Sequence, residues 1–317
     1  MSQSTQPVVS TGQQVADLRQ RNSARSFEGD KTRLAWLLLT PTMLLIAFVA
    51  LWPLAQTIYQ SFTNARLASG VAPKFIGLEN YRYLLLEDTA FRTSIWTTIK
   101  FSFITVLFEF LLGLGIALVI NSNFKGRGLM RTAMLVPWAI PTVVSAQMWK
   151  WMYNDIYGPI NDFLVRRVHI LAEPVAFIAD PSTSLWAVAA VDIWKTTPFV
   201  ALLLLAGLQV IPEDVYEAAR IDGASALQAF LRITLPLLRP AILVTLIFRT
   251  LDALRVFDVI FVMFGARPDT QTMSIYAQNN IVAFSDLGYG SAISVAIFLI
   301  IGIFVIAYVT FLKVEEN

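Results

Sequence analysis

The sequence has no cysteine and a single histidine, His169. The absence of cysteine excludes disulfide frameworks, cysteine-ligated metal sites and thiol chemistry. A histidine-dependent catalytic triad would have to use His169, which lies in a polar segment. No Gly-Lys-Ser or Gly-Lys-Thr occurs, so the chain lacks the phosphate-binding loop of an ATPase. The net charge of +2 is too small to indicate a nucleic-acid partner.

Long apolar runs dominate what is present. The chain is 56% hydrophobic, above the roughly 45–50% of soluble domains. A bilayer core about 30 Å thick needs about 20 apolar residues per helix, and runs of that length recur. We predict an all-α membrane protein with six transmembrane helices and both ends on the same side. The predicted spans are residues 34–59, 94–120, 132–153, 184–209, 238–263 and 290–312.

The domain organisation follows from these spans. Residues 1–33 are rich in Ser, Gln and Thr and are predicted to form a disordered tail, because they have too few large apolar side chains for a core. Residues 34–312 form the predicted six-helix membrane domain, which includes a polar loop at 210–237. Residues 313–317 form a short second tail.

Lysine and arginine in the loops predict the orientation. With the termini inside, the inner segments carry twelve of these residues and the outer segments seven. The bias is sharpest in the short turn 121–131, which carries Lys125, Arg127 and Arg131. We therefore place both tails and the loop 210–237 in the cytoplasm, and the chain in the cytoplasmic (inner) membrane.

The loop 210–237 has a clear local pattern of two helices. Pro212 suits the first turn of a helix, and the acidic residues that follow it favour the positive helix start. Gly223 can end this helix in a left-handed conformation. Ser225 and Gln228 are spaced as a capping box that opens a second helix. Pro236 and Pro240 mark a bend into the fifth span.

The same loop carries a specific motif. Residues 217–240 read EAARIDGASALQAFLRITLPLLRP. This string resembles the EAA loop of bacterial ABC importer permeases, in the carbohydrate version of the maltose/trehalose type. The resemblance implies the type I importer fold with a maltose/molybdate permease-like core. It also implies that the loop is the coupling helix that docks on an ATPase, with the ATPase-coupling residues Glu217, Ala218, Ala219, Asp222 and Gly223.

The resemblance extends over most of the chain after residue 34. Residues 75–81, FIGLENY, are similar to a segment of the first outer loop in sugar permeases. Phe257-Asp258, Thr272, Tyr276 and Gly288-Tyr289 also match that subfamily. The chain departs from it at 265–268, where Gly-Ala-Arg-Pro replaces the usual Gly-Gly-Pro.

Ionisable residues lie deep within three predicted spans. Asp192, Lys195, Arg249 and Asp252 fall near the bilayer middle, and Glu109 lies in the second span. Each charge costs at least about 2.5–3.5 kcal/mol there on insertion scales, so the charges must be paired or must line water. Two interpretations stay open. In one, Asp192 pairs with Lys195 and Arg249 with Asp252 as structural contacts; in the other, the charges form a translocation site.

The family resemblance favours the translocation site. The sugar-contacting positions of maltose-type permeases fall on Asp192, Lys195, Thr196, Phe199, Arg249, Asp252, Ala253 and Val256 of this sequence. Charged groups stand where the maltose proteins use amides and small residues. The segments 194–199 and 248–253 are most similar to trehalose permeases. Trp138 and Trp194 are among the tryptophans that could stack on a sugar.

The resemblance implies a transport subunit and no enzyme. The implied function is ATP-driven import of a di- or oligosaccharide, of trehalose or maltose type, by alternating access. The implied partners are a second homologous permease, two cytoplasmic ATPase subunits that bind the ATP and Mg, and an extracytoplasmic sugar-binding protein. No cofactor or metal is expected in this chain. The alternatives are a glycerol phosphate or polyol importer and a proton-coupled secondary transporter that uses Glu109, Asp192 and Asp252.

Overall fold

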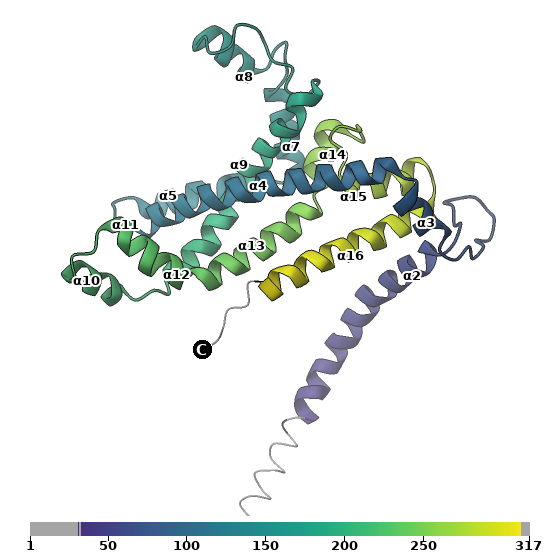
Figure 1. Cartoon of the computed structure of the whole chain (residues 1–317), viewed down its shortest axis with the longest axis horizontal. Helices are drawn as coiled ribbons and strands as arrows, with labels where there is room; N and C mark the ends of the chain where they lie inside the picture. The colour runs from purple at the N-terminus through teal and green to yellow at the C-terminus, as the bar shows by residue number, and fades with distance from the viewer. Residues whose placement is uncertain (1–30, 32, 312–317) are drawn as a thin grey trace, which may run out of the picture. The chain divides into compact units, whose positions relative to one another are not determined.

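The computed structural model describes residues 31 and 33–311 (Figure 1). The predicted tails 1–33 and 313–317 lie outside the described residues, apart from residues 31 and 33. The chain divides into two compact units, Met1–Thr57 and Ile58–Asn317. A long apolar helix, Arg33–Ser61, covers the described part of the first unit. It includes η1 (Ala47–Leu51) and α2 (Trp52–Ser61).

The regular elements among the described residues of the second unit are all helices, and the only β structure there is two isolated bridges. The six predicted spans correspond to four long apolar helices and two bent helix pairs. The remaining elements are α3 (Glu79–Leu86), α4 (Thr89–Asn121), α5 (Arg127–Met134), α6 (Val136–Ala139), α7 (Thr142–Met152), α8 (Pro159–Asn161), η2 (Asp162–Arg167), α9 (Pro181–Leu208), α10 (Glu213–Ile221), α11 (Ala226–Ala229), η3 (Phe230–Thr234), α12 (Leu235–Leu237), α13 (Arg239–Leu254), α14 (Asp258–Phe264), α15 (Met273–Gln278), η4 (Asn279–Ala283) and α16 (Leu287–Phe311).

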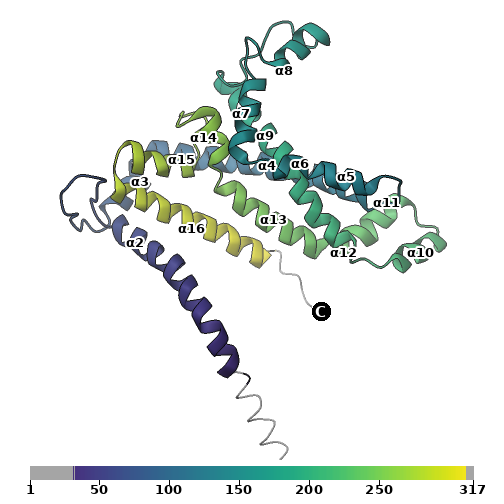
Figure 2. The ribbon, with the colours of Figure 1, turned by 180° about the vertical axis from the view of Figure 1, so that it is seen from behind.

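The centre of this unit is the packing of α4 against α9, with α13 and α16 alongside (Figures 1 and 2). Asp88 caps the start of α4 by accepting a hydrogen bond from the Phe91 amide at 2.9 Å. The two helices approach closely at Gly113, where a Cβ atom would lie 2.7 Å from the Val200 Cγ1. Glycine at this position therefore permits the contact between α4 and α9.

Three apolar clusters stabilise the unit. One joins α4, α7, α9 and α14 and includes Phe101, Val188 and Ile260. A second joins α3, α15 and α16 around Leu84. The third lies where α4 and α9 approach the start of α13, around Leu204 and Leu238. The first and third clusters lie at opposite ends of α9, so the middle of the helix is left to polar residues.

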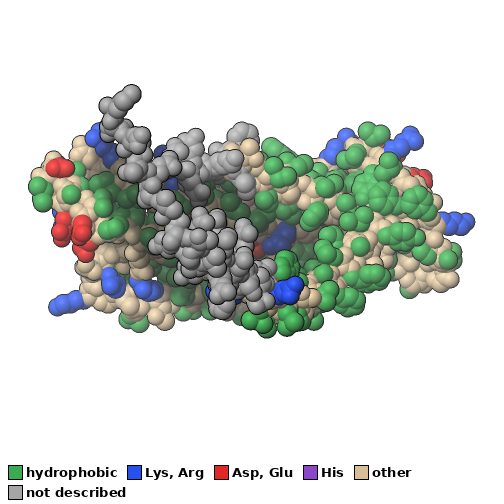
Figure 3. Space-filling view, turned by 90° about the horizontal axis from the view of Figure 1, so that it is seen from below, with side chains coloured by type: hydrophobic (Ala, Val, Ile, Leu, Met, Phe, Trp, Pro, Cys, Tyr) green, Lys and Arg blue, Asp and Glu red, His purple; other side chains and the backbone are tan. Residues whose placement is uncertain are grey.

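Much of the outer surface is apolar, as a lipid environment requires. In the face shown in Figure 3, hydrophobic side chains cover much of the right half, whereas most of the acidic side chains in view gather at the left end. The acidic group on the left of this view belongs to the end that carries α10 and α11 in Figure 1.

The third and fifth predicted spans are interrupted rather than continuous helices. The pair Arg127–Ala139 and Thr142–Met152 is bent by 88° at Pro141. The pair Ala226–Leu237 and Arg239–Phe264 is bent by 65°, which confirms the bend predicted from Pro236 and Pro240. A further interruption at 255–257 separates α13 from α14. The prediction of an unbroken helix over 132–153 and over 238–263 was therefore wrong.

Candidate functional site

A polar cavity of about 440 Å³ lies between the two interrupted helices and the middle of α9. Its wall consists of the residues at the α6–α7 break, one turn of α9 and the residues at the α13–α14 break. These residues are Trp138, Ala139, Ile140, Pro141, Thr142, Asp192, Lys195, Thr196, Asp252, Arg255, Val256, Phe257, Asp258 and Val259.

The α6–α7 wall exists because Pro141 interrupts the helix. Proline lacks an amide N–H and pushes the preceding residue out of the helical region, and Ile140 is extended with ψ of 132°. The interruption frees main-chain carbonyls. The ammonium group of Lys195 donates hydrogen bonds to the carbonyls of Ile140 and of Trp138, the latter at 3.4 Å. Lys195 thus satisfies the backbone that Pro141 leaves unpaired.

The opposite wall is the non-helical segment between α13 and α14. Arg255 and Asp258 are both exposed there and face the cavity. The carbonyl of Val256 accepts a hydrogen bond from Thr272 Oγ1 at 3.1 Å. Irregular backbone at membrane depth is tolerated where it is buried in protein or lines a water-filled cavity, and this segment meets that condition.

Arg249 connects three helices behind the cavity. Its guanidinium donates to both carboxylate oxygens of Glu109 on α4, with the Nη2–Oε1 distance at 2.9 Å. It also donates to Asp192 on α9 and, at 2.8 Å, to Asp252 on its own helix. We call Glu109, Asp192, Arg249 and Asp252 the Arg249 cluster. The Arg249 cluster lies beside the middle of α9, between the first and the third apolar clusters.

Burial divides the Arg249 cluster into two parts. The side chains of Glu109, Arg249 and Asp192 are 0%, 3% and 12% exposed, whereas that of Asp252 is 67% exposed. Removing one partner of a buried ion pair leaves an uncompensated charge and typically costs about 3–5 kcal/mol. The buried part therefore joins α4, α9 and α13, whereas Asp252 is the most exposed member of the cluster and lines the cavity.

The structure corrects one predicted pairing. Arg249 does contact Asp252, as one interpretation held, but Asp192 forms its ion pair with Arg249 rather than with Lys195. The reason is that the two carbonyls at the Pro141 break take up the ammonium group of Lys195. Glu109, the most buried member, was not predicted as a partner of Arg249.

Five of the eight predicted substrate-binding residues line the cavity: Asp192, Lys195, Thr196, Asp252 and Val256. The other three do not. Arg249 is buried behind Asp192, and Ala253 is fully buried. Phe199 lies behind Trp138, whose ring stacks on it with centroids 5.9 Å apart.

Sequence reasoning did not assign Arg255, Phe257 or Asp258 to the site. The i, i+3 spacing of Arg249, Asp252, Arg255 and Asp258 was visible, but a continuous helix was expected there. Trp138 was one of several aromatic candidates, and it is the one that lines the cavity. Trp194 instead packs edge-on against Trp149, with centroids 5.4 Å apart.

The cavity combines hydrogen-bond donors, acceptors and an aromatic face. Lys195 and Arg255 donate, Asp252 and Asp258 accept, and the Trp138 ring offers a flat apolar surface. Such a set suits a polar solute with several hydroxyl groups. Among the described residues no group of three or more Asp, Glu or His is arranged to hold a metal ion.

The predicted coupling loop forms the helices that its sequence indicated. α10 ends before Gly223, which has φ of +76°, and Ser225 and Gln228 form the capping box at the start of α11. Tyr216 and Thr234 share a hydrogen bond at 3.0 Å that ties α10 to the following helix. Glu217, Ala218, Asp222 and Gly223 are exposed, and only Ala219 is buried.

Comparison with curated proteins gives relatives that match most of the chain. The trehalose/maltose transport system permease protein MalF of Thermococcus litoralis is 43% identical over 88% of this chain and 93% of that protein. The sulfoquinovosyl glycerol transport system permease protein SmoG of Agrobacterium fabrum is 41% identical over 85% and 87%. The trehalose transport system permease protein SugA of Mycobacterium tuberculosis is 39% identical over 84% of each chain.

Solved structures have the same fold. A chain of a bacterial ABC transporter that imports the acidic polysaccharide alginate superposes with a TM-score of 0.78 at 22% identity, over 92% of this chain and 100% of that one. Residues 109–313, more than half of this chain, match the family described as binding-protein-dependent transport system inner membrane component. The chain therefore belongs to this family of inner membrane transport proteins.

Proposed function

We propose that this chain is the permease subunit of an ATP-driven sugar importer and that its substrate is a di- or oligosaccharide of trehalose or maltose type. The observation that carries the proposal is the cavity at the two helix breaks, where carboxylates and cations surround an aromatic face. Its volume of about 440 Å³ falls within the range of small-molecule sites, about 300–1,000 Å³. The curated relatives for trehalose and maltose support the same substrate class.

The residues of the cavity have separate roles in this proposal. Asp252 and Asp258 accept hydrogen bonds from sugar hydroxyls, and Arg255 donates to them. Thr196 lines the wall from α9, and Trp138, supported by Phe199, stacks on a sugar face. Asp192, Lys195, Arg249 and Ala253 complete the proposed site by fixing the walls, since their side chains are buried or already paired. Val256 lines the wall, and its carbonyl is held by Thr272.

The proposed partners follow from the exposed surface of α10 and α11. Glu217 is exposed there, and Ile221 is 86% exposed beside it. An apolar side chain so exposed at a helix end suits insertion into a cleft of another protein. We assign this surface to a cytoplasmic ATPase, with two ATPase copies, a second permease and an extracytoplasmic sugar-binding protein in the complete importer. One solved relative of the fold is an alginate transporter in complex with a periplasmic protein.

The orientation and domains belong to the same proposal. The termini and residues 210–237 lie in the cytoplasm, and residues 34–312 form the membrane domain. The loops at the other end, which include 62–78 and 265–272, then face the binding protein. The excess of Lys and Arg in the segments assigned to the inside supports this orientation.

The test is uptake by the complete importer in proteoliposomes with ATP inside. Labelled trehalose and maltose should accumulate. Asp252→Asn should raise the KM for uptake several-fold, since a sugar hydroxyl would lose a charged acceptor, and a hydrogen bond to a charged group contributes about 1.5–3 kcal/mol. Asp162→Asn, in an exposed ion pair remote from the cavity, is the matched control. Uptake of glycerol phosphate in place of both sugars, or uptake by this chain alone under a proton gradient, would refute the proposal.

A further inference from the structure

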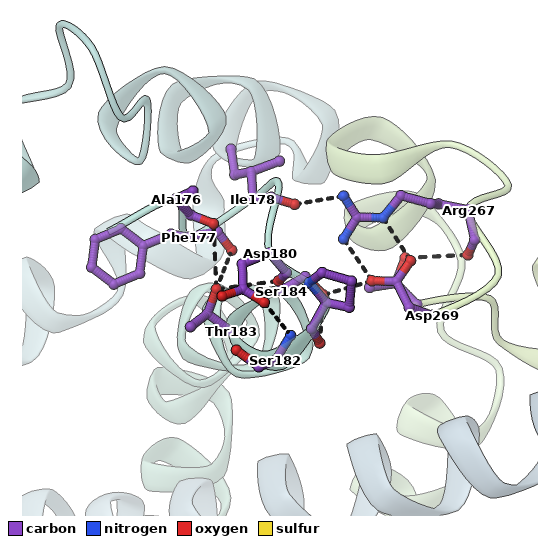
Figure 4. A network of polar contacts seen from close by, with 11 residues as sticks. Ala176, Phe177, Ile178, Asp180, Ser182, Thr183, Ser184, Arg267 and Asp269 are labelled. Carbon is purple, nitrogen blue, oxygen red and sulfur yellow. Dashed lines mark hydrogen bonds and ion pairs between the residues drawn. The ribbon is translucent and has the colours of Figure 1, made fainter. Parts of the chain in front are cut away.

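The loop between α14 and α15, residues 265–272, is attached to α9 by a charged network (Figure 4). The guanidinium of Arg267 donates two parallel hydrogen bonds to the Asp269 carboxylate, each of 2.6 Å. Its third donor reaches the carbonyl of Ile178 at 2.6 Å. Asp269 also accepts a hydrogen bond from Ser184 Oγ at 2.8 Å. We call these four residues the Arg267 latch.

The latch connects two segments that are far apart in the sequence, residues 178–184 and the 265–272 loop. Ile178 precedes α9, Ser184 lies in its first turn, and Arg267 and Asp269 belong to the loop. Bidentate arginine–carboxylate pairs fix geometry as well as charge. Arg267 also belongs to the stretch Gly-Ala-Arg-Pro at 265–268, where the sequence departs from the Gly-Gly-Pro of similar sugar permeases.

The surroundings of the latch limit its freedom further. The Arg267 guanidinium lies 5.0 Å from the centre of the Phe264 ring. The side chains of Arg267 and Asp269 are 29% and 22% exposed. Burial opposes the charge of Asp269, but the hydrogen bonds from Arg267 and Ser184 and the charge of Arg267 hold the pKa of Asp269 below its ordinary value.

The other end of the loop reaches the cavity wall. Thr272 Oγ1 donates to the carbonyl of Val256, which lines the cavity. The next residue, Met273, donates its amide to Thr98 Oγ1 on α4 at 2.9 Å. One short loop therefore extends from the Arg267 latch to the helix break that forms the cavity.

We propose that Arg267 and Asp269 are positioning residues that hold the 265–272 loop fixed against α9, so that contact with the sugar-binding protein at this loop is transmitted to the cavity wall at Val256. This inference rests on the proposed function, which places the loop on the outer face. A loop that is already ordered loses less conformational entropy when a partner binds. The latch thus favours docking of the binding protein and keeps the docked surface in a fixed position relative to the cavity wall.

The first test measures ATP hydrolysis by the complete importer as its trehalose-loaded binding protein is titrated. In Arg267→Ala, the binding-protein concentration for half-maximal stimulation should rise about fivefold or more, because several side chains must then be ordered on docking. Basal hydrolysis without binding protein should stay at the wild-type rate. Arg166→Ala is the matched control, since Arg166 is 77% exposed and forms an exposed ion pair with Asp162.

The second test restores the connection covalently. Because this chain has no cysteine, the pair Ser184→Cys and Asp269→Cys can be introduced without removing other thiols from it. When reduced, this variant should resemble Arg267→Ala; when oxidised to a disulfide, it should recover most of the stimulation. The unmodified importer with and without reductant is the control.

The outcomes separate the two proposals. If the binding protein stimulates the unmodified importer and Arg267→Ala responds identically, the latch proposal is overturned. It is also overturned if the oxidised cysteine pair abolishes stimulation, since the loop would then have to move away from α9. If trehalose-loaded binding protein does not stimulate the unmodified importer, the proposed function fails, and the latch inference with it.

Discussion

Replacing Arg249 should damage the protein far more than replacing its exposed partner Asp252. Arg249→Gln removes the cation that Glu109 and Asp192 share and leaves two carboxylates in a buried site. Asp252→Asn removes a carboxylate that is 67% exposed and leaves the buried pairs intact. The two variants therefore separate the structural part of the Arg249 cluster from the part that faces the cavity.

The magnitudes follow from burial. Loss of one partner of a buried ion pair costs about 3–5 kcal/mol, whereas an exposed pair contributes about 0–1 kcal/mol. By the scaling for globular proteins, about 2–4 °C per kcal/mol, Arg249→Gln should lower the Tm by about 6–20 °C. Asp252→Asn should lower it by less than about 4 °C on the same scale.

The assay is thermal unfolding of the purified importer in detergent, followed by the fluorescence of tryptophan, of which this chain has eight. The exchange Arg249→Asp with Asp252→Arg should not rescue stability, because it adds a third carboxylate beside Glu109 and Asp192. Replacing Arg249 and Glu109 together by leucine should recover part of the loss, since buried pairs often exchange for apolar residues with little penalty. Equal Tm values for Arg249→Gln and Asp252→Asn would refute the assignment of Arg249 as a buried connector of three helices.

Three further predictions concern the loops and the Pro141 break. Gly223→Val should largely abolish uptake while the chain still inserts, because φ of +76° strains a β-branched residue by about 1–3 kcal/mol. The control Gly128→Val, at a glycine without positive φ, should transport normally. Normal uptake by Gly223→Val would argue against the coupling assignment. Lys195→Met should reduce uptake and stability, since two carbonyls lose their hydrogen-bond donor and each loss costs about 1–3 kcal/mol. A variant with wild-type uptake and Tm would show that Lys195 is dispensable at the Pro141 break. Because the pKa of Asp269 is lowered, the Arg267 latch should persist above the ordinary carboxyl pKa of about 3.9 and fail as the pH falls through the lowered value. The binding-protein concentration for half-maximal stimulation should therefore be constant from about pH 8 to pH 5. A marked change of that concentration in this window would contradict the prediction.

The sequence predicted most of the helical framework but not its interruptions. Apolar length located all six membrane segments, and local chemistry correctly placed the end of α10 at Gly223 and the capping box at Ser225. Pro141 was a readable signal for the first break, since proline disrupts a helix interior. The break at 255–257 had no such signal, because no proline or glycine occurs between 241 and 264. At this break the Val256 carbonyl accepts a hydrogen bond from Thr272, a residue 16 positions away in the sequence.

The site was predictable only where position along a helix determined it. Family-like spacing brought Asp192, Lys195, Thr196, Asp252 and Val256 to one cavity. The pairing of Arg249 with Glu109 joins residues 140 positions apart, and no local pattern could reveal it. Arg255 and Asp258 were missed for a related reason, since their exposure to the cavity depends on the unpredicted break.

The unequal burial of the Arg249 cluster has a consequence for how such a transporter could change its cargo over evolutionary time. Glu109 and Arg249 are buried and do not line the cavity, and the largely buried Asp192 is paired with Arg249, so any one of the three is hard to replace alone. Asp252, Arg255 and Asp258 are exposed at the cavity and support little packing. New specificity can therefore arise by substitution at the exposed positions while the framework stays folded, which makes this architecture tolerant of adaptation to different solutes.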